Sequence, residues 1–277
     1  MSISAKDVMK LRNMTGAGMM DCKKALTEAE GDFDQAIELL RKTGQKIAGK
    51  RADRDANEGS IFIASDDAST EAFIIELNCE TDFVAKNDDF QAMGKKFVDA
   101  VFANKPENLD ALKAIPLDGE TIGELLVEAM GRIGEKIDIS KYEIVRGDQV
   151  VTYVHPGSRI GVAVAFNGAN GDVETVGKDI AMQITAMNPE AIDESAVSQE
   201  LIDRELRIGR EQAIAEGKPE AIVDKIAQGK LKKFYKESTL MNQAFVKDAS
   251  KSVAQYVKES LGGDAKVTAF KRVQLGA

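Results

Sequence analysis

The side chains that most often do chemistry in proteins are few in this sequence. His155 is its one histidine, and its two cysteines, Cys22 and Cys79, lie far apart and form no CxxC pair. Metal sites built from histidine and cysteine need several such ligands at short, regular spacings. His155 precedes a Pro-Gly turn, where a histidine is most often a surface or packing residue. We therefore expect no metal site and no cofactor, and a reducing compartment fits the cysteines.

A phosphate-binding loop is the nearest match to a catalytic motif. Residues 171–179 read GDVETVGKD, but the first glycine lies one place too early for that motif. In addition, Asp179 replaces the serine or threonine whose hydroxyl would bind magnesium. Paired acids such as Asp88-Asp89 fit solvated turns and helix starts in a chain this rich in acids. The residues form no catalytic set, so we do not expect an enzyme.

Two other stretches have a composition suited to contact with another molecule. Residues 78–87 read NCETDFVAKN and place Phe83 and Val84 where a polar turn is expected, between a strand-like run and a helix-patterned segment. Phe83 can pack on its own molecule there, but nothing in the pattern requires it. Cys79 is expected to be a buried strand residue.

Met19 and Met20 form the second such stretch. They follow the helix break Thr15-Gly16-Ala17-Gly18, and the helical period places Met19 near the apolar face and Met20 off it. Methionine fills gaps in small cores and also forms adaptable contact surfaces. On the pattern alone, core filling is the simpler interpretation.

Three short helices are predicted near the N-terminus. Ser4 with Asp7 resembles a capping box, and Asp32 is placed to cap the third helix. Each segment carries apolar residues at helical spacing, namely Val8 and Leu11, then Cys22, Ala25, Leu26 and Ala29, then Phe33, Ala36, Ile37 and Leu40. We expect a three-helix domain over residues 1–44 and, because residues 45–59 show no sustained apolar period, an exposed linker after it.

Two similar units of strands and helices are predicted to follow. In residues 71–79, Phe73, Ile75 and Leu77 alternate with other residues, as in a half-buried strand. Strands over residues 60–65 and 71–79 and two helices form core lobe one, at residues 60–134. Strands over residues 136–146, 150–155 and 159–167 lead into a helix of core lobe two, at residues 135–277.

A helical hairpin is predicted within the second lobe, at about residues 198–236. Each of its two segments has a narrow apolar stripe, as in antiparallel helices that pack on each other and project from the body. The stripes are Ile202, Leu206, Gly209 and Ala213 in the first and Ile222, Ile226 and Gly229 in the second. Residues 266–274 form a last strand that would complete the lobe. A partner surface and a dimer contact both remain open for the hairpin.

Composition excludes several classes of function. The 277 residues are 30% charged and 43% hydrophobic, which is typical of a globular protein, and the net charge is −9. This charge argues against a surface that wraps nucleic acid or binds anionic lipid. Apolar runs are too short for a membrane span. The first residues, MSISAKDVMKLRN, match neither a signal peptide nor a transit peptide, so we expect a cytoplasmic protein.

Four stretches resemble the elongation factor Ts family. LRNMTGAGMMDCKKAL at residues 11–26 and NCETDFVA at residues 78–85 are similar to its two signature sequences. HPGSRIGV at residues 155–162 and GKLKKF at residues 229–234 are further likenesses. The resemblance keeps its order from about residue 4 to residue 273.

The resemblance implies both a fold and a function. The fold is α+β, with an N-terminal three-helix domain of the ubiquitin-associated type, a two-lobed α+β core with antiparallel sheets, and an inserted antiparallel helical hairpin. The function is guanine-nucleotide exchange on elongation factor Tu, in its GDP-bound and nucleotide-free states, during translation in the bacterial cytoplasm. A homodimer through the hairpin is a further expectation, and neither nucleic acid nor a membrane is an expected partner.

Site residues carry over from the family to matching positions of this sequence. The turn that would disturb the partner's magnesium site consists of Thr81, Asp82, Phe83 and Val84. Contacts of the N-terminal domain with the partner's nucleotide domain fall to Arg12, Met19 and Met20. His155, on the second lobe, would meet a different domain of the partner.

Three other functions compete with this interpretation. A ubiquitin-like adaptor would explain the three-helix domain, but it leaves residues 81–87 and both lobes without a role. A nucleic-acid-binding module would rest on six bases around the linker, which the net charge opposes, namely Arg41, Lys42, Lys46, Lys50, Arg51 and Arg54. An enzyme lacks a site.

Overall fold

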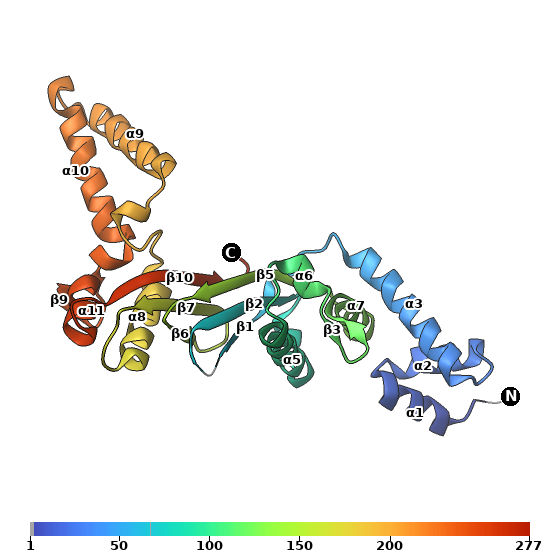
Figure 1. Ribbon diagram of the computed structural model, residues 1–277. Coiled ribbons are helices and arrows are strands. Elements are labelled where there is room, and N and C mark those ends of the chain that lie inside the picture. Colours follow the sequence, from blue (N-terminus) through green and yellow to red (C-terminus); the bar gives the residue numbers. More distant parts are fainter. Residues whose placement is uncertain (1–2, 67) are drawn as a thin grey trace.

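The molecule is elongated and consists of three parts in a row (Figure 1). The computed structural model describes residues 3–66 and 68–277. A helical bundle at the N-terminal end is followed by a core built on two antiparallel sheets, and a helical hairpin projects from the far end of that core. This is the α+β architecture that the sequence predicts.

The N-terminal bundle contains α1 (Ala5–Thr15), α2 (Met19–Glu28) and α3 (Phe33–Arg51). Ser4 and Asp7 form the predicted capping box, and the Asp32 carboxylate accepts a hydrogen bond from the backbone N–H of Gln35. The three helices bury one small core, made of Val8, Leu11, Cys22, Ala25, Leu26, Ala29 and Ala36.

The third helix is longer than the sequence predicts. It continues to Arg51, so the linker expected over residues 45–59 is helical in its first part, and the next strand already begins at Glu58. The last part of α3, after Gly44, lacks an apolar stripe for a physical reason. Gly44 is buried where α3 crosses α7 (Ile122–Ile133), and the contact is made by backbone rather than by a large side chain.

The first sheet has the strand order β1-β2-β5, and all its pairs are antiparallel. Its strands are β1 (Glu58–Ser65), β2 (Glu71–Cys79) and β5 (Ile137–Arg146). The boundary expected at residues 134–135 would put β5 in lobe two, whereas β5 pairs with β2 from Cys79↔Ile137 to Glu71↔Arg146. Periodicity identifies a strand but not its partner, which is why the expected boundary differs from the pairing.

The second sheet has the order β10-β7-β6 and is also antiparallel. Its strands are β6 (Gln149–Val154), β7 (Ile160–Asn167) and β10 (Lys266–Gln274). The final strand therefore completes this sheet, as predicted. Shorter elements complete the lobe, namely η1 (Glu194–Ala196), η2 (Leu240–Asn242), β8 (Ala244–Phe245) and β9 (Asp248–Ser252).

Helices cover the outer face of each sheet, and the two inner faces pack on each other. The first sheet carries α5 (Asp88–Asn104), α6 (Leu109–Lys113) and α7, with β3 (Pro116–Leu117) and β4 (Glu120–Thr121) beside them. The second sheet carries α8 (Val173–Met187) and α11 (Val253–Leu261). Between the sheets lies a third cluster, which includes Ile61, Ile74, Val145 and Ala163.

This layering corrects the prediction for β2. The alternation of Phe73, Ile75 and Leu77 indicated a half-buried strand, but Ile74 is as fully buried as its neighbours. Phe73, Ile75 and Leu77 pack under the helices, while Ile74 packs against the second sheet. A strand in the middle of stacked layers has no solvent face.

The hairpin consists of α9 (Gln199–Ala215) and α10 (Glu220–Ser238), which pack along each other (Figure 1). The predicted stripe on α9 holds at Gly209 and Ala213, both buried. On α10 the predicted stripe is wrong, because Ile222 and Gly229 are exposed and the buried positions are Val223, Ala227 and Leu231. The sequence has an apolar residue at both Ile222 and Val223. Because Gly209 of α9 lies close to Ala227, α10 turns the face with Val223 and Ala227 toward α9, and Ile222 stays exposed.

Candidate functional site

Residues 81–84, called the Phe83 turn below, lie between β2 and α5. The expected polar turn is a single turn of helix, α4 (Asp82–Ala85). Thr81 is its N-cap, and the Thr81 hydroxyl accepts a hydrogen bond of 3.4 Å from the backbone N–H of Val84. Such a cap satisfies one of the free N–H groups at a helix start. The aromatic residue thus stands on a defined helical turn rather than on an irregular loop.

Phe83 points away from the molecule that carries it. Its side chain is 84% exposed, whereas Ala85 is buried and Val84 packs against the core of the first lobe. Burying a phenylalanine is favourable by roughly 1.5–3 kcal/mol, and this free energy is not gained here within the chain. The structure therefore answers the question that the sequence left open, because Phe83 is not packed on its own lobe.

Asp82, beside Phe83, is also accessible. Its carboxylate accepts a hydrogen bond of 2.6 Å from the Lys86 ammonium group one turn along the chain. This hydrogen bond and the positive charge of Lys86 lower the pKa of Asp82. Asp82 therefore presents a charged carboxylate at neutral pH, next to the exposed ring.

The base of the Phe83 turn is fastened to the lobe by buried or half-buried groups. The backbone N–H and the hydroxyl of Thr81 donate hydrogen bonds of 3.0 and 2.7 Å to the Glu135 carboxylate. The Cys79 thiol donates to the Thr81 carbonyl oxygen at 3.1 Å. Cys79 is buried as predicted, and burial raises the pKa of its thiol to about 12, so it stays protonated at neutral pH.

Glu80 connects this base to the N-terminal bundle. Its carboxylate accepts hydrogen bonds from Arg51 Nη1 (2.6 Å), Arg54 Nη1 (3.0 Å) and the backbone N–H of Lys136 (2.7 Å). Burial disfavours the charge, but these three donors outweigh it and lower the pKa of Glu80 to about 2. We call Glu80, Arg51, Arg54 and Lys136 the Glu80 clamp.

Sequence reasoning identified neither the Glu80 clamp nor Glu135. The partners of Glu80 lie 26 to 56 positions away along the chain. No local period connects such residues, and the arginines lie where the sequence predicted a linker. The one available signal was the charge of Glu80 directly after a buried strand, since a carboxylate there needs donors.

Acid is expected to destabilise the fold partly through Glu80. Its pKa is depressed from 4.5 to about 2 in the folded chain, so its contribution is complete above pH 4.5 and is lost as the pH falls through about 2. The shift corresponds to about 3 kcal/mol at most. Glu80→Gln should lower the urea midpoint at neutral pH and make the decline below pH 4.5 shallower.

Glu38→Gln is the matched control, because Glu38 pairs with Lys42 on the exposed surface of α3. Exposed ion pairs contribute little to stability. If Glu38→Gln and Glu80→Gln lowered the urea midpoint equally, Glu80 would make no special contribution to stability.

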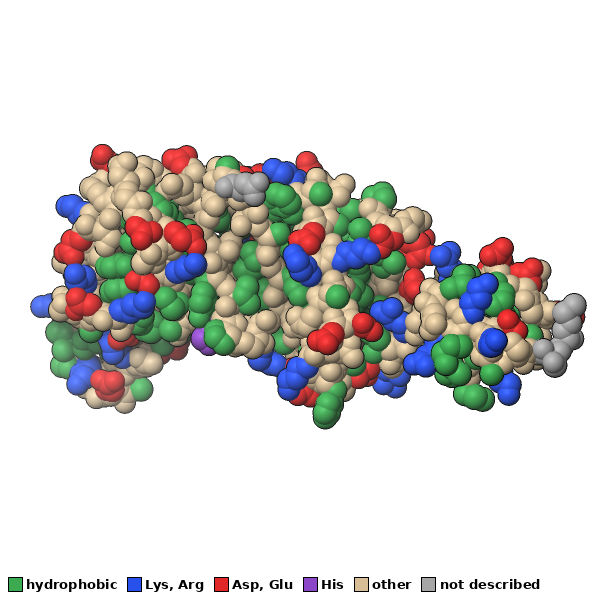
Figure 2. Space-filling model, turned by 90° about the horizontal axis from the view of Figure 1, so that it is seen from below, with side chains coloured by type: hydrophobic (Ala, Val, Ile, Leu, Met, Phe, Trp, Pro, Cys, Tyr) green, Lys and Arg blue, Asp and Glu red, His purple; other side chains and the backbone are tan. Residues whose placement is uncertain are grey.

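The predicted contact residues of the N-terminal bundle are accessible. Arg12 is exposed near the end of α1, and at the start of α2 Met19 is 40% and Met20 74% exposed. Core filling, the simpler interpretation from the pattern, is therefore wrong for both methionines. Met14 is 56% exposed as well. Figure 2 shows hydrophobic side chains at the surface of the bundle, which forms the separate knob at the right.

His155 stands apart from these residues, on the turn between β6 and β7. Its side chain is exposed, and its Nδ1 atom lies 2.9 Å from the Tyr153 hydroxyl. The turn is closed by backbone hydrogen bonds from Ser158 N–H to the His155 carbonyl and from His155 N–H to the Ile160 carbonyl. His155 is thus held on a defined turn of the second sheet.

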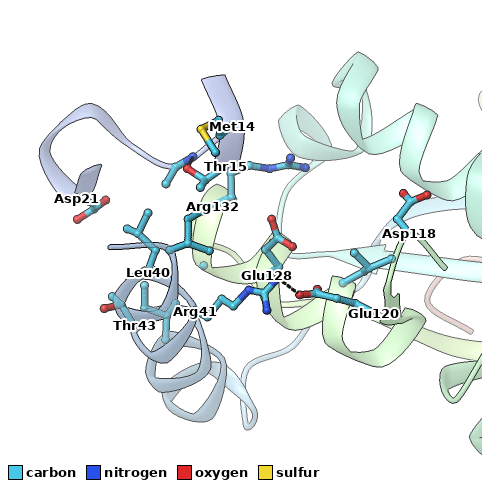
Figure 3. A pocket seen from close by; sticks show the side chains of 16 residues that line it. Met14, Thr15, Asp21, Leu40, Arg41, Thr43, Asp118, Glu120, Glu128 and Arg132 are labelled. Atoms are coloured by element: carbon cyan, nitrogen blue, oxygen red, sulfur yellow. Dashed lines mark hydrogen bonds and ion pairs between the residues drawn. The ribbon is translucent and has the colours of Figure 1, made fainter. Parts of the chain in front are cut away.

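A pocket of about 470 Å³ lies between the bundle and the first lobe (Figure 3). Arg41 of α3 pairs with Glu120 across it, and Arg132 of α7 reaches toward Thr15 at the end of α1. Its walls come from both parts, so its shape depends on how α3 sits on α7. The Phe83 turn contributes no residue to it.

Two further features, a metal-binding cluster and a membrane-spanning helix, are absent from the described residues. Within residues 3–66 and 68–277, no group of three or more His, Cys, Asp and Glu side chains is placed to hold a metal ion. In the same part of the chain, no helix is both long and apolar enough to cross a membrane.

Comparison with known proteins gives one consistent result. The family model described as "Elongation factor TS" matches residues 80–277. The chain is 52% identical to elongation factor Ts of Amoebophilus asiaticus, with 100% of both chains covered. It is 49% identical to that of Christiangramia forsetii and 46% identical to that of Cytophaga hutchinsonii, with 99% of each chain covered. The chain therefore belongs to the elongation factor Ts family.

Proposed function

We propose that this protein promotes the release of GDP from elongation factor Tu by inserting the Phe83 turn next to the partner's nucleotide site. Membership of the family implies nucleotide exchange on this partner. The observation that carries the finer proposal is the exposed Phe83 ring beside a charged Asp82 on a braced helical turn. A bacterial cytoplasmic setting follows from the same proposal, because translation takes place there.

The proposed mechanism acts on a magnesium ion held by the partner. Mg²⁺ requires near-ideal octahedral geometry, so a small displacement of its ligands weakens its binding. Phe83 would supply the volume that displaces them, and Asp82 would supply a competing carboxylate. Once the ion is displaced, the β-phosphate of GDP loses its counter-charge and GDP dissociates faster. No bond is made or broken, so this chain needs no catalytic acid or base.

Contacts away from the Phe83 turn would hold it in place. Met20, Met19 and Arg12 of the bundle and His155 of the second sheet are exposed and belong to separate parts of the molecule. Attachment at several points raises the effective concentration of each contact. Linkage requires the reverse effect too, so nucleotide must weaken the grip of the factor on its partner.

The exchange assay is the direct test. Elongation factor Tu loaded with a fluorescent GDP analogue is mixed with excess unlabelled GDP, with and without this protein, and release is followed by stopped flow. We expect a marked acceleration. If the protein does not accelerate release, the proposed function is wrong.

Removing magnesium tests the mechanism separately. With excess EDTA the partner has already lost its ion, so we expect the protein to accelerate release much less, and the difference between wild type and Phe83→Ala to shrink. Free-magnesium titration of the release rate measures this. If Phe83→Ala slows GDP release by the same factor with and without EDTA, the ring does not act on the metal site.

Met20→Ala tests the bundle contact. Because Met20 is 74% exposed, we expect an unchanged urea midpoint but at least fivefold weaker binding to the nucleotide-free partner, which is about 1 kcal/mol. Binding is measured by calorimetry. Met187→Ala serves as the control, since Met187 is a 45% exposed methionine of the second lobe. If the two substitutions have the same effect, Met20 is not a specific contact.

A further inference from the structure

We propose that the Glu80 clamp is a positioning device that joins the N-terminal bundle to the Phe83 turn, so that both meet the partner as one rigid unit. Its role in exchange rests on the proposed function, whereas its effect on the Phe83 turn can be tested without the partner. Glu80 and its basic partners are then positioning residues, which act through Phe83.

The clamp fastens the end of α3 from two directions. Glu80 accepts from the guanidinium groups of Arg51, the last residue of α3, and of Arg54 just beyond it. In return, the Lys136 ammonium group donates hydrogen bonds to the carbonyl oxygens of Ala52 (2.7 Å) and Arg54 (2.8 Å). Both carbonyls lie just beyond the last residue of α3, at the negative end of the helix dipole, where a positive charge is favourable. The helix end is therefore held by four hydrogen bonds.

Two short segments, residues 80–81 and 135–136, hold both the end of α3 and the Phe83 turn. Glu80 is followed by Thr81, the N-cap of α4, and Lys136 is preceded by Glu135, which accepts both hydrogen bonds from Thr81. The Lys136 backbone N–H closes the arrangement by donating to Glu80 at 2.7 Å. A continuous path of hydrogen bonds and single peptide links thus runs from the end of α3 to Thr81, the residue that starts the turn of Phe83.

A second attachment fixes the direction of α3. A Cβ atom added at Gly131 of α7 would lie 2.7 Å from the Cα atom of Gly44 on α3, so the two helices touch through backbone. Arg51 lies seven positions after Gly44, which is about 10 Å along a helix. Two attachments at this separation hold a helix much better than one. Because α2 packs on α3, the Met19 and Met20 surface is held with it.

A surface ion pair with no role in positioning would be the simplest alternative. Exposed pairs contribute little to stability and exchange freely with water. The Glu80 side chain is only 17% exposed and has a backbone donor besides two guanidinium groups. Glu71 provides an equivalent at the opposite end of β2, since it is also 17% exposed and pairs with Lys105 and Arg146. Glu71 lies away from the Phe83 turn and is the matched control.

The experiment uses a tryptophan as the probe of the turn. The sequence contains no tryptophan, so Phe83→Trp introduces a unique signal at an exposed position. We measure its time-resolved anisotropy in the full chain, alone and combined with Glu80→Ala or Glu71→Ala. Glu80→Ala should increase the amplitude of the fast depolarisation, whereas Glu71→Ala should leave it unchanged. Arg51→Met, which leaves the Lys136 donor in place, gives a second variant if Glu80→Ala folds poorly.

Exchange kinetics give the second measurement, with Phe83 in place. Glu80→Ala should lower the maximal rate of GDP release about ten- to a hundredfold, because misplacing a working group by about 1 Å has effects of this size. The concentration of factor needed for half-maximal release should change less, since the bundle contacts remain. Glu80→Gln, which keeps an acceptor for the Lys136 N–H, should recover part of the rate.

The outcomes separate the two proposals. If the anisotropy at position 83 does not change in Glu80→Ala or Arg51→Met, the positioning role is wrong. It is also wrong if Glu71→Ala changes anisotropy and exchange equally. If Glu80→Ala loosens the probe while the wild-type protein does not accelerate GDP release at all, the clamp positions the turn as inferred and the proposed function is what fails.

Discussion

Phe83→Ala is expected to remove most of the exchange activity while the protein stays folded. The ring is 84% exposed, so its loss opens no cavity, and the free energy of unfolding should change by less than about 0.5 kcal/mol. An aromatic residue at the centre of an interface commonly contributes about 2–4 kcal/mol to binding. The accelerated rate of GDP release should therefore fall roughly 30- to 1000-fold. Stopped-flow release and urea unfolding of the same preparation measure both quantities.

Two other substitutions control for size and for exposure. Phe90→Ala removes the same ring from a fully buried position on α5 and should cost roughly 3–5 kcal/mol of stability. Val246→Ala shortens a 48% exposed side chain of the second lobe and should change neither stability nor exchange. Loss of stability in Phe83→Ala comparable to that in Phe90→Ala would mean that Phe83 is a core residue. Normal exchange by a folded Phe83→Ala protein would remove the Phe83 turn from the mechanism.

Local patterns in the sequence predict much of this fold. The capping box of Ser4 and the cap at Asp32 place the first and third helices, because capping depends on residues three positions apart. The strand at Lys266–Gln274 is placed to the residue by its pattern. The helix-patterned segment after residues 78–87 is α5, whose buried face includes Phe90, Gly94, Phe97, Val98 and Val101.

Long-range contacts are what the sequence does not reveal. Periodicity shows that residues 136–146 form a strand, but the pairing of β5 with β2 depends on contacts between residues about 70 positions apart. Likewise, the sequence predicts that the third helix ends near Gly44, because the second half of α3 packs through glycine and not through an apolar stripe. For the site, local reasoning indicated an unusual aromatic at Phe83. It could not indicate the partners of Glu80 and Glu135, because these come from other elements.

Gly59→Ala is expected to destabilise the first lobe strongly. Gly59 has a φ of +142°, which side chains rarely adopt, and a Cβ atom there would lie 2.0 Å from the Leu77 carbonyl oxygen. That oxygen belongs to β2, which is hydrogen-bonded on both sides and cannot move away. Backbone strain and steric overlap each cost about 1–3 kcal/mol. We expect a loss of roughly 3–5 kcal/mol, which urea unfolding measures.

The effect should extend to the Phe83 turn, since Gly59 pairs with Asn78 and Glu58 with Cys79, directly before Glu80. Exchange by the folded fraction of Gly59→Ala should therefore fall as well. Gly49→Ala is the matched control, because Gly49 is exposed on α3 with no heavy atom within 4 Å of the added Cβ. Alanine is favoured over glycine inside a helix, so this variant should gain roughly 0.5–1 kcal/mol. If both alanines were tolerated equally, β1 would not approach β2 as closely as described, and the strand leading into the Phe83 turn would be held less firmly than its register indicates.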